Sequence, residues 1–218
     1  MHFIMTQNDN DNKAIGRYVF PLLREPDNER SFAGTAFLID GYLVTAGHVI
    51  DHNKTYYLYT GGHSYPLAWE NWIPKQLPAE SKLEWDVAMY PTEGLPSPLT
   101  WADDEVEQGD ELELVCWQMM PGGKIQQVKS SCLCLGRGEE DGYLRMSTVQ
   151  PITHGASGCP VFRGDKLYGI LTMGRDYYEL PQGLTGYTPA TIQLRQRLEK
   201  NTCWVFKTSY IRRFLPKK

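Results

Sequence analysis

Three short motifs, far apart in the chain, carry residue types that could together perform nucleophilic acyl transfer. They are TAGH at 45–48, WDVA at 85–88 and GASGCP at 155–160. A serine hydroxyl is a poor nucleophile near neutral pH, so it needs an imidazole to accept its proton and a carboxylate to orient that imidazole. His48, Asp86 and Ser157 would fill these roles as general base, orienting carboxylate and nucleophile.

The glycines that flank Ser157 favour a tight turn whose amides could stabilise a developing oxyanion. We assign the oxyanion-binding donors to the amides of Gly155 and Ser157. This mechanism requires neither a metal nor an organic cofactor, and we expect none. Cys132 and Cys134 alternate along one face of an expected strand, and no second pair with metal-binding spacing follows, so we interpret them as structural.

Other arrangements of catalytic groups fit less well. The nucleophile elbow of α/β-hydrolases needs G-x-S-x-G and the chain order serine, acid, histidine. Here position 159 is Cys, and the order is histidine, acid, serine. Glu84 and Asp51 compete with Asp86 as the orienting carboxylate, but Asp86 is favoured because an apolar stretch, VAMY, follows it directly. Cys159 is interpreted as a small buried side chain, with a redox-sensitive thiol beside the nucleophile as the alternative.

The chain resembles the trypsin-like (chymotrypsin-fold) serine peptidases over nearly its full length, and its pattern is closest to the bacterial glutamyl endopeptidases and HtrA-like proteases. The resemblance depends on GTAFLIDGYLVTAGHV at 34–49, DVAMY at 86–90 and GASGCPVF at 155–162. It implies an all-β fold of two six-stranded antiparallel β-barrels, with the active site in the cleft between them and a short C-terminal helix.

Local patterns agree with an all-β fold, because short segments rich in β-branched and aromatic residues alternate with Gly, Pro and Asp-Gly turns. Asp40-Gly41 predicts a two-residue hairpin turn that delivers His48 to the end of a strand. We expect strands at 34–39, 42–45, 55–60, 87–90, 111–117, 129–135, 143–147, 160–162, 166–172 and 203–207.

The expected organisation has three parts. A polar tail covers 1–13, the first barrel covers 14–100 and carries His48 and Asp86, and the second barrel covers 101–218 and carries Ser157. A connector rich in Pro and acidic residues spans 93–110. An insertion at about 175–202, helical over 190–201, is expected to cover part of the cleft, and 209–218 is expected to form the terminal helix.

The resemblance also suggests which residues contact a substrate, listed as Ile152, Thr153, His154, Leu171, Thr172, Met173 and Gly174. Pro151 stands where relatives that select basic residues carry Asp, and Leu171 stands where relatives that select acidic residues carry His, so we expect an uncharged residue before the scissile bond. The alternative is an acidic residue that receives positive charge from His154 or Arg175. Ala156 stands where zymogens of this family carry an activating Asp. We therefore expect no requirement for N-terminal cleavage.

Composition restricts the possible partners. The net charge of −4 disfavours nucleic acids and anionic membranes as partners. The sequence contains no apolar run of about 18 residues, the length that a helix needs to span a bilayer. The polar N-terminus does not resemble a secretion signal, and five cysteines, an odd number, favour a reducing compartment. We expect a cytoplasmic endopeptidase with a protein or peptide substrate, whose activity is either constitutive or gated by a regulatory protein partner, although export by another route stays open. The alternative is a silent peptide-binding module.

Overall fold

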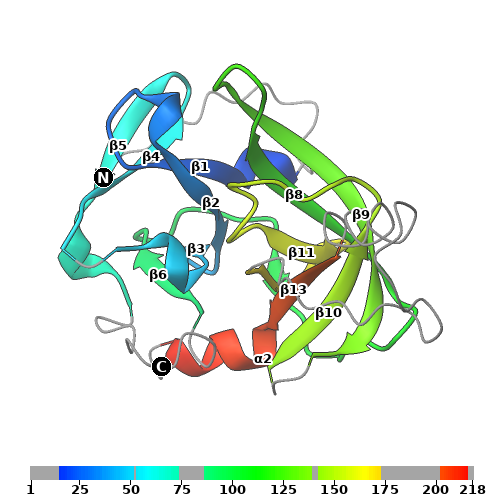
Figure 1. Ribbon diagram of the computed structural model, residues 1–218. Helices are drawn as coiled ribbons and strands as arrows, with labels where there is room; N and C mark the ends of the chain where they lie inside the picture. The colour runs from blue at the N-terminus through cyan, green and yellow to red at the C-terminus, as the bar shows by residue number, and fades with distance from the viewer. Residues whose placement is uncertain (1–14, 52, 74–85, 139–141, 173–201, 216–218) are drawn as a thin grey trace.

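The computed structural model describes residues 15–51, 53–73, 86–138, 142–172 and 202–215, which form two β-sheets that pack side by side (Figure 1). The strands are β1 (Val19–Leu23), β2 (Phe32–Ile39), β3 (Tyr42–Thr45), β4 (Tyr56–Thr60), β5 (His63–Leu67), β6 (Ala88–Pro91), β7 (Thr100–Trp101), β8 (Glu111–Met119), β9 (Ile125–Arg137), β10 (Tyr143–Thr148), β11 (Pro160–Arg163), β12 (Lys166–Leu171) and β13 (Thr202–Lys207). The short helix α2 (Thr208–Ile211) follows β13 directly. The predicted all-β class with a short C-terminal helix is confirmed.

The first sheet has the strand order β5-β4-β1-β2-β3-β6, with antiparallel neighbours throughout. Asp40 and Gly41 have φ values of +47° and +77° and join β2 to β3, as the sequence predicts for a two-residue hairpin. After β5 and a 3₁₀ turn (Trp69–Asn71), Ile73 exchanges two backbone hydrogen bonds of 2.8 Å with Met89 of β6. This bridge connects the two ends of the sheet.

The second sheet has the order β11-β8-β9-β10-β13-β12-β7, and an additional pairing of β11 with β12 closes six of its strands into a ring. The seventh strand, β7, pairs in parallel with β12, whereas the other strand pairs are antiparallel. β7 falls inside the segment that we expected to be only a connector. The expected pair of antiparallel barrels therefore gains one short parallel strand.

The ten expected strands are all present, with ends that differ by up to four residues. Three further strands were missed, namely β1, β5 and β7. Proline disfavours strand interiors because it cannot donate to the ladder, and Pro21 and Pro66 lie within β1 and β5. β7 has only two residues, too few for a periodic pattern. The predicted helix at 190–201 and the insertion at 175–201 lie outside the described residues.

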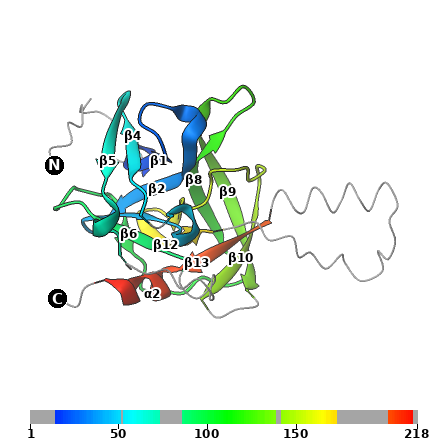
Figure 2. The same ribbon diagram turned by 60° about the vertical axis from the view of Figure 1, so that its left-hand side comes forward.

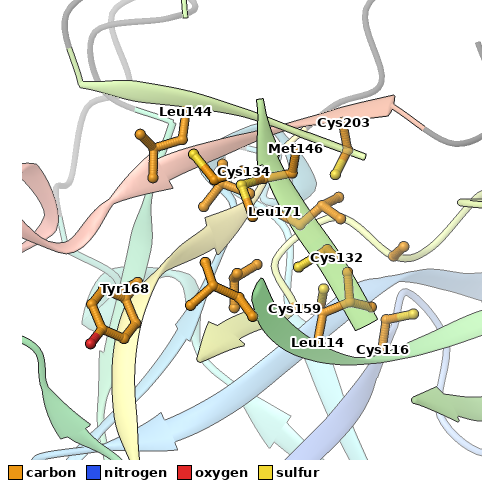
Figure 3. Close-up of a cluster of buried hydrophobic side chains, with 14 of the residues drawn as sticks. Leu114, Cys116, Cys132, Cys134, Leu144, Met146, Cys159, Tyr168, Leu171 and Cys203 are labelled. Atoms are coloured by element: carbon orange, nitrogen blue, oxygen red, sulfur yellow. The ribbon is translucent and has the colours of Figure 1, made fainter. Parts of the chain in front are cut away.

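A hydrophobic cluster fills the second barrel and contains the five cysteines, all buried with free thiols (Figure 3). Along β9 the burial alternates, so that Cys132 and Cys134 are 2% and 1% exposed while Leu133 between them is 40% exposed. Among the described residues, no group of three or more side chains is arranged to bind a metal.

Side chains from both sheets form a second cluster that joins the two halves. It contains Val19 and Phe37 from the first sheet and Val115, Phe162 and Phe206 from the second. Figure 2 shows α2 below β12 and β13, at the end of the molecule away from the β4–β5 hairpin. In the described part of the chain, no helix is both long enough and apolar enough to cross a membrane.

Candidate active site

His48 lies in a 3₁₀ turn (Gly47–Val49) immediately after β3. Its backbone N–H donates to Asp86 Oδ1 at 2.8 Å, and its Nδ1 lies 2.9 Å from both Oδ1 and Oδ2 of the same carboxylate. A carboxylate in this position stabilises the tautomer with the proton on Nδ1, which leaves Nε2 as the basic nitrogen. The His48 side chain is 35% exposed and that of Asp86 is 6% exposed, so the imidazole is accessible and the carboxylate is not.

Strand pairing brings these two residues together. Thr45, at the end of β3, pairs with Ala88, at the start of β6, and Asp86 lies just before β6. Asp51, a competing carboxylate in the sequence, instead forms an exposed ion pair with Lys54 at 2.8 Å. The other competitor, Glu84, lies outside the described residues.

Ser157 lies in the second of two consecutive tight turns between β10 and β11. The amide of Ala156 donates to the carbonyl of Thr153 at 3.3 Å, and that of Cys159 donates to the carbonyl of Ala156 at 3.1 Å. Gly155 and Gly158 have φ values of +97° and +88°. A side chain at either position would also collide, with the Phe32 ring at Gly155 and with the backbone of β2 at Gly158. Both glycines are therefore required by conformation and by space.

The amides of this loop divide into two sets. Those of Ala156, Gly158 and Cys159 donate to backbone carbonyls. Within the described part of the chain, the amides of Gly155 and Ser157 have no hydrogen-bond partner. Sequence analysis assigned these two amides as the donors that bind an oxyanion, and both N–H groups are free to donate to one.

The Ser157 hydroxyl donates to the carbonyl of Thr172 at 2.7 Å, and it does not bond to His48 in this conformation. The loop nevertheless packs against the turn that carries His48. A Cβ built on Gly158 would lie 2.9 Å from the amide nitrogen of Ala46, two residues before His48. A change of the serine rotamer is therefore needed before the imidazole can accept its proton.

Thr35 of β2 connects the two halves at this site, and sequence analysis missed it. Its backbone N–H donates to the carbonyl of Ser157 at 2.9 Å, and its hydroxyl donates to the carbonyl of Gly155 at 2.8 Å. The same hydroxyl accepts from the Trp117 amide at 2.9 Å, and the Thr35 carbonyl accepts from the Thr45 hydroxyl at 2.7 Å. The only signal in the sequence is its place in the GTAF segment.

The expected substrate-binding residues occupy different environments. Thr153 and His154 are exposed, the Thr153 hydroxyl donates to Gln118 Oε1 at 2.7 Å, and the His154 carbonyl accepts from the Met119 amide. Ile152 is partly buried against the core of the second barrel, whereas Leu171 packs inside that core with 1% exposure. Thr172 is 3% exposed. Met173 and Gly174 lie outside the described residues.

No protein-family model and no curated protein sequence matches the chain, but solved structures match it along most of its length. The active form of the Rv3671c protease from M. tuberculosis covers 99% of this chain and 92% of its own, with 15% identity and a TM-score of 0.59. Neuropsin, a serine protease of mouse brain, covers 90% and 93%, with 14% identity and a TM-score of 0.61. This chain has the chymotrypsin-like two-barrel fold.

The same fold is shared by human heparin binding protein, which covers 96% of this chain and 94% of its own, with 12% identity and a TM-score of 0.59. At such identities the likeness establishes the fold, and a fold hosts more than one function. The closer resemblance to glutamyl endopeptidases and HtrA-like proteases stays a prediction. Function must therefore be argued from the site.

Proposed function

We propose that this protein is a serine endopeptidase that cleaves peptide bonds through an acyl-enzyme intermediate. The observation that carries the proposal is the pair formed by His48 and Asp86, in which one carboxylate accepts from both the backbone and the ring of the histidine. The Ser157 turn, with two unpaired amides, supports it because it supplies a nucleophile and an oxyanion site together.

The chemistry can be followed atom by atom. The Ser157 hydroxyl leaves the Thr172 carbonyl, donates its proton to His48 Nε2 and attacks the substrate carbonyl. The amides of Gly155 and Ser157 stabilise the oxyanion, and Asp86 stabilises the imidazolium. His48 then donates the proton to the leaving amine as the C–N bond breaks. Next, His48 accepts a proton from water, the water oxygen attacks the acyl carbonyl, and the proton passes to the Ser157 oxygen as the acyl group is released.

Substrate preference belongs to the same proposal. Thr153 and His154 are exposed next to the Ser157 turn, so they are available to contact a substrate. Neither Pro151 nor the buried Leu171 offers a charge to a substrate side chain, which supports an uncharged residue before the scissile bond. We further propose limited cleavage of protein substrates in the cytoplasm, with an activity that is either constitutive or controlled by a protein partner.

A second candidate function is peptide binding without turnover, and one observation favours it. The Ser157 hydroxyl is directed to Thr172 O rather than to the histidine. Rotation about a single side-chain bond is a fast and inexpensive change, whereas the His48–Asp86 pair is already assembled. We therefore prefer catalysis.

Reaction with a fluorophosphonate probe, followed by intact-mass measurement, separates the two functions. Catalysis predicts one adduct on the wild-type chain that is lost in both Ser157→Ala and His48→Ala. The matched control is Ser131→Ala, which removes an exposed hydroxyl on β9 and should keep the adduct. A folded wild-type chain that forms no adduct, or an adduct retained in Ser157→Ala, would overturn the proposed mechanism.

A further inference from the structure

Two of the five buried cysteines face each other across neighbouring strands of the second barrel. β8 and β11 are antiparallel, and Val161 lies opposite Leu114. The same register, continued by two residues, places Cys159 directly opposite Cys116. Both side chains are 0% exposed and belong to the hydrophobic cluster of this barrel (Figure 3). Their thiols are hydrogen-bonded to each other.

The backbone at this position is compatible with a disulfide. The Cys159 N–H donates to the carbonyl of Ala156 at 3.1 Å, and its carbonyl accepts from the amide of Leu171 at 2.9 Å, so Cys159 exchanges no backbone hydrogen bond with Cys116. Opposed antiparallel residues of this kind have Cα atoms about 4.5 Å apart. Disulfides join Cα atoms that are about 4.4–6.8 Å apart, so a bond between the two sulfur atoms requires little movement of either strand.

No other pair of cysteines is placed in this way. Cys132 and Cys134 are neighbours on one face of β9, about 6.6 Å apart, which exceeds the Cβ separation of about 3.5–4.5 Å that a disulfide needs. Cys203 on β13 is separated from β9 by β10 and from β11 by β12, and β8 separates β11 from β9. Cys116 lies four residues along β8 from the position opposite Cys132. Only Cys116 and Cys159 occupy opposed positions on neighbouring strands.

The two thiols also differ in chemical environment. The Cys116 sulfur accepts from Gln118 Nε2 at 3.1 Å and from the Cys159 thiol. The hydrogen bond from Cys159 lowers the pKa of Cys116, whereas burial raises the pKa of Cys159 well above its usual range. Since the thiolate is the species that attacks a disulfide, Cys116 is the first nucleophile of the pair and Cys159 the second.

Gln118 connects this pair to the turn that precedes Ser157. Its side chain is 4% exposed, and its Oε1 accepts from the Thr153 hydroxyl at 2.7 Å. The Thr153 carbonyl in turn accepts from the amide of Ala156 at 3.3 Å, which closes the tight turn that contains Gly155. A disulfide would draw the Cys116 sulfur away from Gln118 and leave the buried amide N–H without its acceptor. Buried donors seldom remain unpaired, so Gln118 would reorient and release Thr153.

We propose that Cys116 and Cys159 form a disulfide when the chain folds in the presence of glutathione disulfide, and that this bond displaces the Gly155 turn. The Cys116 thiolate attacks one sulfur of glutathione disulfide and releases one glutathione. The Cys159 thiolate then attacks the Cys116 sulfur of the mixed disulfide and releases the second glutathione. The protein dithiol loses two electrons, glutathione disulfide gains them, and the two thiol protons pass to the two glutathione thiolates.

The experiment compares two preparations of the full-length chain, synthesised in a cell-free system with either excess glutathione disulfide or reduced glutathione alone. The folded fraction of each is denatured in N-ethylmaleimide, and its adducts are counted by intact mass. We expect five adducts on the reduced chain and three on the oxidised chain. Proteolytic mapping should find Cys116 linked to Cys159 as the predominant disulfide.

Two variants identify the pair. Cys159→Ala should show four adducts in both preparations, because Cys116 has no other partner within reach. The matched control is Cys134→Ala, which removes another buried thiol of the same cluster and should show two adducts when oxidised and four when reduced. Five adducts on the oxidised wild-type chain, or a different predominant linkage, would overturn the proposed disulfide.

The effect on the turn is read from the two wild-type preparations. The amide resonances of Gly155 and Ala156 should differ between the oxidised and reduced chains, whereas that of Gly61, in the β4–β5 hairpin, should not. Identical Gly155 resonances would overturn the link to the turn. Fluorophosphonate labelling of the oxidised chain should be at least about tenfold slower, because the Gly155 amide is misaligned. This last measurement alone rests on the proposed protease function, so a reduced chain without labelling would count against that function and not against the disulfide.

Discussion

Substitution of Thr35 by valine tests whether β2 of the first barrel positions the Ser157 turn of the second. Valine keeps the shape of the side chain but has no hydroxyl. The change removes two buried hydrogen bonds, one to the Gly155 carbonyl at 2.8 Å and one from the Trp117 amide at 2.9 Å. The bond from the Thr35 backbone to Ser157 would remain.

The magnitude follows from the two groups left without a partner. An unsatisfied buried polar group costs about 1–3 kcal/mol, so two of them should lower the free energy of unfolding by about 2–6 kcal/mol. For a chain of 218 residues this corresponds to a fall in Tm of roughly 4–24 °C. The Gly155 amide also loses alignment, and removal of one oxyanion donor slows catalysis by about 100- to 1,000-fold. We expect fluorophosphonate labelling of the folded fraction to slow by at least about tenfold.

Stability is measured by urea unfolding, and the labelling rate is measured per folded molecule at a temperature well below the lower Tm. The matched control is Thr208→Val, which removes the buried hydroxyl of the C-terminal helix that donates to the Tyr168 carbonyl at 3.3 Å. This control should lose about 1 kcal/mol and keep the labelling rate. If Thr35→Val behaves like Thr208→Val, then Thr35 contributes to stability alone, and the argument for positioning is refuted.

Three other perturbations have definite expected outcomes. Asp86→Asn replaces one carboxylate oxygen by an amide donor and favours the wrong tautomer of His48, so labelling should slow by about 10⁴-fold with little change in Tm; a rate near wild type would contradict the role proposed for the His48–Asp86 pair. Gly158→Ala would push a Cβ into β2 at a positive φ, so circular dichroism should show a chain that no longer melts cooperatively, whereas Gly164→Ala, in open space, should remain folded. Burial raises the pKa of Cys132 to about 12 and that of Cys203 further, whereas the hydrogen bond with Cys159 lowers the pKa of Cys116. Because all five thiols are buried (Figure 3), iodoacetamide at pH 8.5 should alkylate no native thiol but all five after denaturation; rapid native labelling would show an accessible thiol.

Most of the fold could be predicted from local patterns. The hairpin at Asp40-Gly41 and the strands around it were found because turn chemistry and apolar runs agree there. β1 and β5 were missed because each contains a proline, although every residue of β1 is buried. β9 extends four residues earlier and two later than expected, since its polar ends are stabilised by pairing with β8 and β10 rather than by an apolar pattern.

The site was predictable in its residue types but not in its connections. Motif chemistry selected Asp86 over Asp51, and the structure pairs Asp86 with His48. The bond from Ser157 to Thr172 and the contacts of Thr35 depend on three-dimensional packing between residues up to 120 positions apart, so no local pattern could reveal them. The Thr92 hydroxyl is of the same kind, since only the folded chain shows that this buried oxygen has no hydrogen-bond partner among the described residues.

The link between Thr35 and the Ser157 turn also bears on the order in which the site forms during synthesis of the chain. Translation delivers β2 long before the Ser157 turn, and 120 residues separate the threonine from the glycine that it contacts. Neither half expressed alone contains both partners, and a nascent chain that stops before Thr153 lacks the turn. The proposed peptidase therefore has no assembled site until both β2 and the Ser157 turn have left the ribosome.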